Sequence, residues 1–327
     1  MRFIFWGKPW FVAVPGDPGA RGPRGRQGRA INNKTESFMK KTCVMIGAAF
    51  LGCAARAELI AYEPFQYRDG NGESLIGGGT GTGWDGKWVA GAPSWYTGSS
   101  YALFTRHLNP VFDFHYADTN GLALPCKGKT YASLSVSSPG FDGAWEGFYA
   151  SRAFAQTNAV QVGDSIWISL LALQNSSAAA TSARNYIQLE TVGGQNWSVI
   201  GCPADSSALE ELQWGIINYY GKESYHFAPS PILSSGQPMF LVVRVTMTSA
   251  SACSISLWVN PLDMSSVASL GTPYVSTPNN PSSGLFTGVM FHTDRRRTFS
   301  FDEIRVGTEL RDVTRSDPLG PTRLIVK

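Results

Sequence analysis

The stretch FLVVRVTMTSASACSISLWVN, residues Phe240–Asn260, contains two short segments in which apolar and polar side chains alternate. An apolar residue recurs at every second position from Leu241 in the first segment and from Ile255 in the second. A period of two is that of a β-strand with one buried face. The stretch therefore predicts a hairpin. A register with Arg244 opposite Trp258 keeps its two apolar faces together.

Similar runs of β-branched and aromatic residues, bounded by Gly, Pro, Asn and Ser, recur along the chain. Helix signals are scarce, and a capping box at Ser207–Glu210 predicts only a turn or two. The sequence thus predicts an all-β fold of two packed antiparallel sheets. Besides the hairpin, the clearest predicted strands are 129–136, 146–154, 165–173, 185–191, 214–220, 288–293 and 298–307.

The last predicted strand changes phase. Phe299 and Phe301 alternate in one phase, and Ile304 and Val306 alternate in the other. A bulge near Asp302 would bring both pairs to the core side. We expect this strand, Thr298–Gly307, to lie beside the segment Leu59–Tyr67, which places the two ends of the domain together.

A signal peptide is predicted at residues 39–57. Met39-Lys40-Lys41 precedes an apolar run that ends in the small-x-small triplet Ala55-Arg56-Ala57. This order of a basic, an apolar and a small-residue region is typical of a secretory signal, with cleavage before Glu58. The apolar run is too short for a transmembrane anchor, which needs about 20 residues. A lipoprotein site at Cys53 is a minor alternative. We expect export to the cell surface, the periplasm or the medium.

Residues 1–38 are interpreted as upstream sequence wrongly included before a true start at Met39. Glycine falls at every third place from Gly16 to Gly28, but so few triplets would not hold a collagen triple helix. The remaining boundaries predicted are a sandwich domain at 58–313 and a flexible tail at 314–327. That domain length suits one β core.

The basic character of the chain belongs mainly to residues 1–57, which hold 10 of the 27 Lys and Arg and 2 of the 24 Asp and Glu. Without them, 17 basic face 22 acidic residues, a net charge of −5. This balance disfavours nucleic acid as a partner. Cys126, Cys202 and Cys253 remain, which allows one disulfide of undetermined pairing and no zinc pattern.

Four motifs carry a resemblance to a known family: Glu63–Phe65, Gly77–Trp88, Leu257–Pro261 and Phe301–Gly307. They resemble the exported concanavalin A-like lectin/glucanase, or laminin-G-like jelly-roll, proteins of environmental bacteria. The resemblance extends from about Ala61 to Val313. It implies a two-sheet antiparallel jelly-roll sandwich with a carbohydrate-type ligand. Many such proteins end in a Pro-Glu-Pro sorting segment, which this sequence does not contain.

Catalytic patterns are missing from the sequence. The hydrolases of the family that the chain resembles carry a Glu-x-Asp-x-x-Glu-like run on one strand face, and no such run occurs. Asp302 and Glu303 point to opposite faces of a regular strand, and Glu210-Glu211 suits a helix start. We therefore predict no enzyme activity and no catalytic residues.

Two weak metal-type patterns also have simpler explanations. Asp69-Gly70-Asn71-Gly72-Glu73 spaces three oxygen ligands as calcium loops do, yet lacks the rest of an EF-hand. Asp113 and His115 share a strand face near His107, which could begin a metal or acid-base site, but a surface or hydrogen-bonded structural role is the preferred explanation. We predict no cofactor, with calcium as the single alternative. Trp84 and Trp88, which follow the glycine-rich motif, are expected to close one end of the sandwich.

The strand phases predict one polar and aromatic outer face. It comprises Trp167, Tyr186, Gln188, Glu190, Arg244 and Trp258, which we expect on one side of one sheet. Such a surface suits sugars, because aromatic rings cover C–H faces while amide, carboxylate and guanidinium groups bind hydroxyls. The alternative is that loops cover this face and Arg244 lies over Trp258 as a cation–π pair. The sequence thus predicts a non-catalytic polysaccharide- or glycan-binding module, with a structural surface protein, a hydrolase or a lyase as alternatives.

Overall fold

The computed structural model describes residues 58–66, 76–91, 101–107, 116–124, 130–136, 147–175, 185–192, 198–202, 214–218, 224–228, 238–294 and 298–314. The chain divides into two compact units, Met1–Ala54 and Ala55–Lys327. Every described residue belongs to the second unit. The predicted signal peptide, the 69–73 loop, the capping box at 207–210 and the pair Asp113 and His115 lie outside the described residues.

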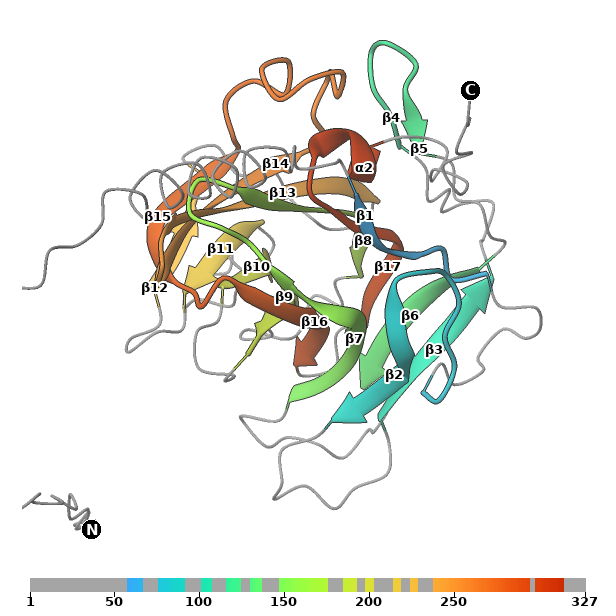
Figure 1. The fold of residues 1–327 in the computed structure, drawn as a ribbon. Helices are drawn as coiled ribbons and strands as arrows, with labels where there is room; N and C mark the ends of the chain where they lie inside the picture. Colours follow the sequence, from blue (N-terminus) through green and yellow to red (C-terminus); the bar gives the residue numbers. More distant parts are fainter. Residues whose placement is uncertain are drawn as a thin grey trace, which may run out of the picture. The chain divides into compact units, whose positions relative to one another are not determined.

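Two antiparallel sheets make up the domain, with the strand orders β15-β14-β13-β8-β17-β6-β3 and β12-β11-β10-β9-β16-β7-β2 (Figure 1). In the first, sheet A, β1 also pairs with β17. This is the predicted jelly-roll sandwich. The strands of sheet A are β1 (Leu59–Glu63), β3 (Tyr101–His107), β6 (Thr130–Val136), β8 (Ser165–Asn175), β13 (Met239–Ser249), β14 (Ala252–Val259), β15 (Val275–Pro281) and β17 (Thr298–Gly307). Those of the second, sheet B, are β2 (Trp84–Gly91), β7 (Gly147–Ala159), β9 (Asn185–Thr191), β10 (Ser198–Cys202), β11 (Gly215–Asn218), β12 (Ser224–Phe227) and β16 (Leu285–Asp294).

Two small elements complete the described part of the chain. A two-stranded ribbon is formed by β4 (Tyr116–Ala117) and β5 (Ala123–Leu124), and the short helix α2 (Leu310–Thr314) follows β17. Within the described residues, no helix has the length and apolarity needed to cross a membrane.

The main core lies between the inner faces of the two sheets. Phe291 of β16 and Phe301 of β17 stack across it with ring centroids 3.7 Å apart. The apolar residues predicted to face inward from the hairpin, from Leu241 to Val259, all belong to this core. Alternation therefore gave the inner faces of β13 and β14 correctly.

The predicted bulge in the last strand is confirmed. The register of β17 against β8 shifts between Asp302 and Arg305, and Glu303 has a positive φ of 51°. Because of this bulge, Phe299 and Phe301 before it and Ile304 and Val306 after it all point into the same core.

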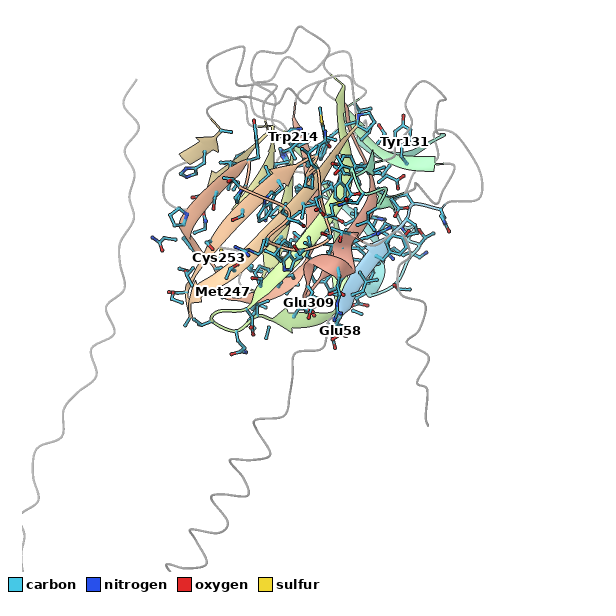
Figure 2. The ribbon with its side chains drawn as sticks, turned by 90° about the horizontal axis from the view of Figure 1, so that it is seen from above. Glu58, Tyr131, Trp214, Met247, Cys253 and Glu309 are labelled. Atoms are coloured by element: carbon cyan, nitrogen blue, oxygen red, sulfur yellow. The ribbon has the colours of Figure 1, made fainter. Side chains whose placement is uncertain are left out.

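The pairing of the two ends of the domain is also confirmed. β1 runs antiparallel to β17, with Leu59 opposite Gly307 and Glu63 opposite Ile304. The backbone N–H of Thr308 donates to the carbonyl of Glu58 at 3.1 Å. Figure 2 shows Glu58 and Glu309 next to each other at this edge.

The predicted hairpin register is wrong by two residues. Trp258 lies opposite Val242, and Arg244 lies opposite Ser256. A slip of two keeps every side chain on its own face, so apolar alternation does not distinguish the two registers. The tight turn, which pairs Ser249 with Ala252 and shifts the register after Met247, sets the actual one.

The glycine-rich motif lies directly against β1. Gly81 and Gly83 both have φ of +80°, and a Cβ there would lie 1.8 Å from the carbonyl oxygen of Tyr62 and 1.9 Å from that of Ile60. Only glycine permits this approach. The motif then leads into Trp88, which is 1% exposed and part of the core. The interpretation that this tryptophan packs the sandwich, rather than stacking on a ligand, is confirmed.

Candidate functional site

The six residues predicted to form one outer face do not converge. Trp167, Arg244 and Trp258 belong to β8, β13 and β14 of sheet A, whereas Tyr186, Gln188 and Glu190 belong to β9 of sheet B. All six point away from the main core, so the alternation was correct. The error arose because alternation separates inner from outer faces but does not say which strands share a sheet.

On sheet A the predicted residues form a packed layer. Trp167 and Trp258 are each 4% exposed and stack with centroids 6.0 Å apart. The Arg244 guanidinium lies 5.5 Å from one ring centroid and 5.9 Å from the other. Met264 and Leu270 from the β14–β15 connection, and Leu310 and Val313 from α2, form one apolar cluster with these rings. The alternative of a covered face with a cation–π contact is therefore correct for the two tryptophans.

On sheet B the outer face carries polar and titratable side chains from three adjacent strands. His292 of β16 lies opposite Tyr186 of β9 on one side and Tyr149 of β7 on the other. Directly opposed residues share a face with Cβ atoms about 5 Å apart. Tyr149, His292 and Tyr186 thus form a row across the sheet, hereafter the aromatic row.

The rings of Tyr186 and His292 are stacked, with centroids 4.2 Å apart and planes inclined by 9°. Tyr186 is 7% exposed, while His292 and Tyr149 are half-buried. The stack holds the imidazole in one orientation. An imidazole changes its protonation near neutral pH, so a fixed one between two phenols is suited to proton transfer.

Gln188 and Glu190 continue along β9 from the aromatic row, on the same face. Gln188 is 2% exposed, and its Oε1 accepts no hydrogen bond from the described residues. Glu190 reaches over Gly288 of β16, where an added Cβ would lie 3.1 Å from its Oε2. Burial raises the pKa of this carboxyl above its usual range.

The raised pKa of Glu190 predicts a pH dependence of stability. An acid whose pKa is higher in the folded than in the unfolded state binds protons more tightly when folded, so stability falls as pH rises from the ordinary to the raised value. Glu190→Gln lacks this contribution. The free energy of unfolding of both proteins is measured by urea denaturation between pH 4 and pH 8. The value for Glu190→Gln minus the value for the wild type should increase as pH rises. Parallel pH curves for the two proteins would contradict the assignment.

Tyr149 and His292 are members of the face that the sequence analysis missed. A signal existed for His292, because the predicted strand 288–293 alternates. Val289 and Phe291 are apolar and buried in the main core, which leaves Met290 and His292 outside. In β7, Ala150 is buried in the main core, so its neighbour Tyr149 points to the outer face. Nothing in the sequence indicates that β7 and β16 are neighbours.

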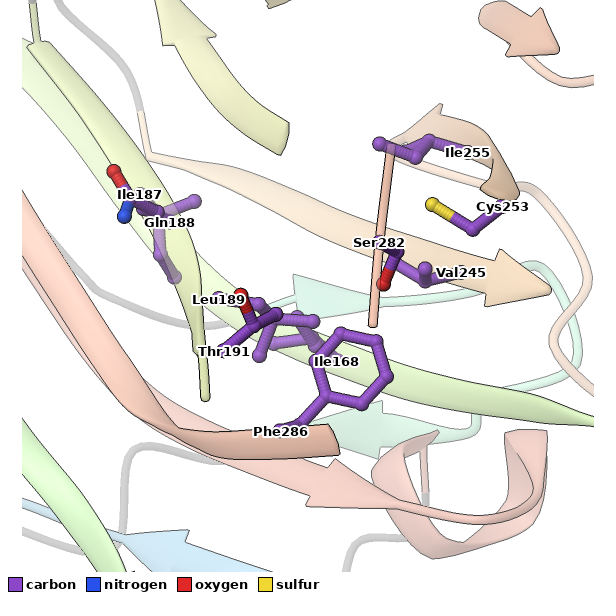
Figure 3. Close-up of a pocket in the computed structure, with 10 residues that line it drawn as sticks. All are labelled: Ile168, Ile187, Gln188, Leu189, Thr191, Val245, Cys253, Ile255, Ser282 and Phe286. Atoms are coloured by element: carbon purple, nitrogen blue, oxygen red, sulfur yellow. The ribbon is translucent and has the colours of Figure 1, made fainter. Parts of the chain in front are cut away.

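An internal cavity of about 20 Å³ lies between the sheets, lined by aliphatic side chains together with Gln188, Thr191, Cys253, Ser282 and Phe286 (Figure 3). That volume accommodates a single water molecule at most. The cavity is therefore too small to hold a sugar. In the described part of the chain, no three His, Cys, Asp or Glu side chains gather as metal ligands would.

No protein-family model and no curated protein matches this chain. Among solved structures it is similar to an endo-β-1,4-glucuronan lyase from the fungus Trichoderma reesei, with 12% identity, coverage of 76% of this chain and 98% of that one, and a TM-score of 0.42. An endo-1,3-β-glucanase from Streptomyces sioyaensis gives 10% identity, 77% and 96% coverage and a TM-score of 0.42. The metal-free carbohydrate recognition domain of Emp46p gives 9% identity, 67% and 87% coverage and a TM-score of 0.35.

These comparisons contradict the prediction that the chain has no enzyme activity. The structures that it is similar to include a glucuronan lyase and a glucanase as well as a carbohydrate recognition domain. The prediction of a module without catalysis is therefore withdrawn.

Proposed function

We propose that this chain is a polysaccharide-cleaving enzyme whose site is the outer face of sheet B, and that it cleaves an acidic polysaccharide by β-elimination. The observation that carries the proposal is the aromatic row, in which His292 is held against Tyr186 and lies next to Tyr149. Gln188 and Glu190 extend the same face along the path of a bound chain. A polymeric substrate also agrees with the export that we propose from residues 39–57.

Elimination needs one base and one acid. In a uronic acid unit, the ring carbon that bears the carboxylate carries a weakly acidic hydrogen. His292 would accept this proton, and the released electron pair forms a double bond to the neighbouring ring carbon. The bond from that carbon to the glycosidic oxygen breaks, and the oxygen takes a proton from the phenol of Tyr149. Exchange with solvent then returns both residues to their starting protonation states.

The other two polar residues of this face would take no part in the proton transfers. Gln188 is 2% exposed and its Oε1 is buried, so it would support the face rather than contact the sugar. Glu190, with its raised pKa, stays protonated to higher pH than an ordinary glutamic acid and can donate a hydrogen bond to the substrate carboxylate. A protonated carboxyl also avoids the repulsion that two carboxylates would cause.

Hydrolysis is the second candidate, and the raised pKa of Glu190 favours it because a general acid must be protonated at working pH. Hydrolysis ordinarily uses two carboxyl groups about 5–9.5 Å apart. On the described part of this face Glu190 is accompanied by Asp85 of β2, which lies three strands away in the same row. At about 4.8 Å between neighbouring strands, this places the two backbones farther apart than such a pair requires. Elimination needs no such pair, which is why we place it first.

The test is to incubate the chain with polyglucuronate, alginate and polygalacturonate, and with neutral β-1,3- and β-1,4-glucans. Elimination predicts new reducing ends together with ultraviolet absorbance of the unsaturated product, on at least one acidic polymer and on neither neutral one. New reducing ends without that absorbance would replace elimination by hydrolysis. No cleavage of any of these polymers would overturn the proposal.

A further inference from the structure

A groove of about 500 Å³ opens on the outer side of sheet A. Its floor is formed by Trp167 and Arg244, and its sides by the β7–β8 turn, the segment Ser265–Val267 and the segment Thr308–Arg311 that begins α2. The aromatic row lies on the other sheet, so this groove is separate from the proposed catalytic face. Its size is that of a small-ligand site.

Arg244 is the unusual residue of the groove. Its Nε atom is buried and makes no hydrogen bond, and no described residue forms an ion pair or hydrogen bond with the guanidinium group. The guanidinium group lies against the rings of Trp167 and Trp258. Buried polar groups in proteins almost always have a partner, so a buried donor without one points to a ligand. The two rings fix the guanidinium plane and reduce the entropy that binding would cost.

The groove offers the partners that a sugar would need around such a cation. Ser165, Ser265, Ser266 and Thr308 bring hydroxyl groups to its lining. Each makes one or more hydrogen bonds within the protein, and a hydroxyl can take part in up to three.

The charged groups at the rim are Asp164, Glu309 and Arg311, and Arg311 forms an ion pair with Glu309 at 2.8 Å. Of the charged groups in the described lining, this ion pair leaves Asp164 and Arg244 without a partner of opposite charge.

We infer that this groove is a second, non-catalytic site that binds the carboxylate group of an acidic saccharide, with Arg244 as its anion-binding residue. A planar guanidinium binds a carboxylate through two parallel hydrogen bonds, and the surrounding hydroxyls bind the sugar ring. The inference goes beyond the proposed function, because it adds a binding site that would retain an acidic glycan on the side of the sandwich away from the site of cleavage.

Binding is measured by isothermal titration of the full chain with glucuronate, with glucose as the neutral counterpart and inorganic sulfate as a free anion. In Arg244→Gln the affinity for glucuronate should fall by about 10- to 100-fold, as expected for hydrogen bonds to a charged group. A melting curve reports whether that variant is folded. The second variant is Val267→Glu, which adds a negative charge at an exposed position of the groove (42% exposed) and should also weaken binding. Leu262→Glu, at a position 72% exposed and outside the lining of the groove, is its matched control and should bind as the wild type does.

Glucuronate must bind more tightly than glucose and sulfate. Equal binding of glucose would overturn the role of the anion, and equal or tighter binding of sulfate would overturn the role of the sugar. Wild-type affinity in a folded Arg244→Gln, or in Val267→Glu if the first variant does not fold, would overturn the site. Loss of binding in these variants with unchanged polysaccharide cleavage would support a site separate from catalysis.

Discussion

In the His292→Ala variant, cleavage of the acidic polymer should slow by about 10²- to 10⁴-fold, the usual contribution of a positioned base or acid. The effect should appear mainly in kcat, since the imidazole acts on the transition state rather than on binding of the chain. The side chain is half-buried and stacked on Tyr186, so melting curves must accompany the rate measurements.

His226 provides the matched control for this prediction. It lies on β12 of the same sheet, opposite Ile216, which belongs to the main core. Opposed residues share a face, so His226 belongs to the inner side and His226→Ala should retain activity. Similar losses in both variants, or activity within twofold of the wild type in His292→Ala, would remove His292 from the mechanism.

Replacing Arg152 by alanine should destabilise the fold by about 3–5 kcal/mol, the cost of leaving one partner of a buried ion pair alone. Arg152 is 5% exposed and forms a salt bridge with Glu63, which is fully buried. The guanidinium also donates to the carbonyl oxygens of Thr80, at 2.8 Å, and Gly86, at 3.1 and 3.2 Å. Its loss would leave the Glu63 carboxylate buried with only the hydrogen bonds from Phe65 and Thr80.

The free energy of unfolding, measured with urea at pH 7, checks this prediction. Arg311→Ala is the control, because its ion pair with Glu309 is exposed (53% and 44%) and contributes about 0–1 kcal/mol. The double variant Glu63→Met/Arg152→Met removes both charges and should be less destabilised than Arg152→Ala alone. Equal losses in the two arginine variants would show that the buried pair has no special role.

Alternation within single strands predicted a large part of this fold. It gave the inner faces of β13 and β14 and the bulge at Asp302, because burial on one side imposes a period of two. It failed for β15, whose sequence Val275–Pro281 contains two prolines. A strand at the end of a sheet tolerates proline, since its outward N–H groups pair with nothing.

The candidate site was predicted only in part, since it depends on which strands are neighbours. The outward direction of Gln188 and Glu190 followed from the phase of β9. The meeting of Tyr186 with His292 and Tyr149 depends on β9, β16 and β7 lying side by side. Strand order results from the packing of the whole chain, and no local pattern in these segments records it. The sequence analysis gave covering of Trp258 by loops as its alternative, but for the same reason it did not indicate that α2 and the β14–β15 connection would supply the cover.

The pairing of β1 with β17 determines when this domain can finish folding. Apart from a single bridge between Tyr62 and Thr82, the partner of β1 in the described sheets is a strand some 250 residues further along the chain. During synthesis β1 emerges first and has no sheet edge to join until the codons for β17 have been translated. Closing so long a loop is slow. Sheet A is therefore completed only after nearly the whole domain has left the ribosome, and until then the nascent chain lacks its native closure.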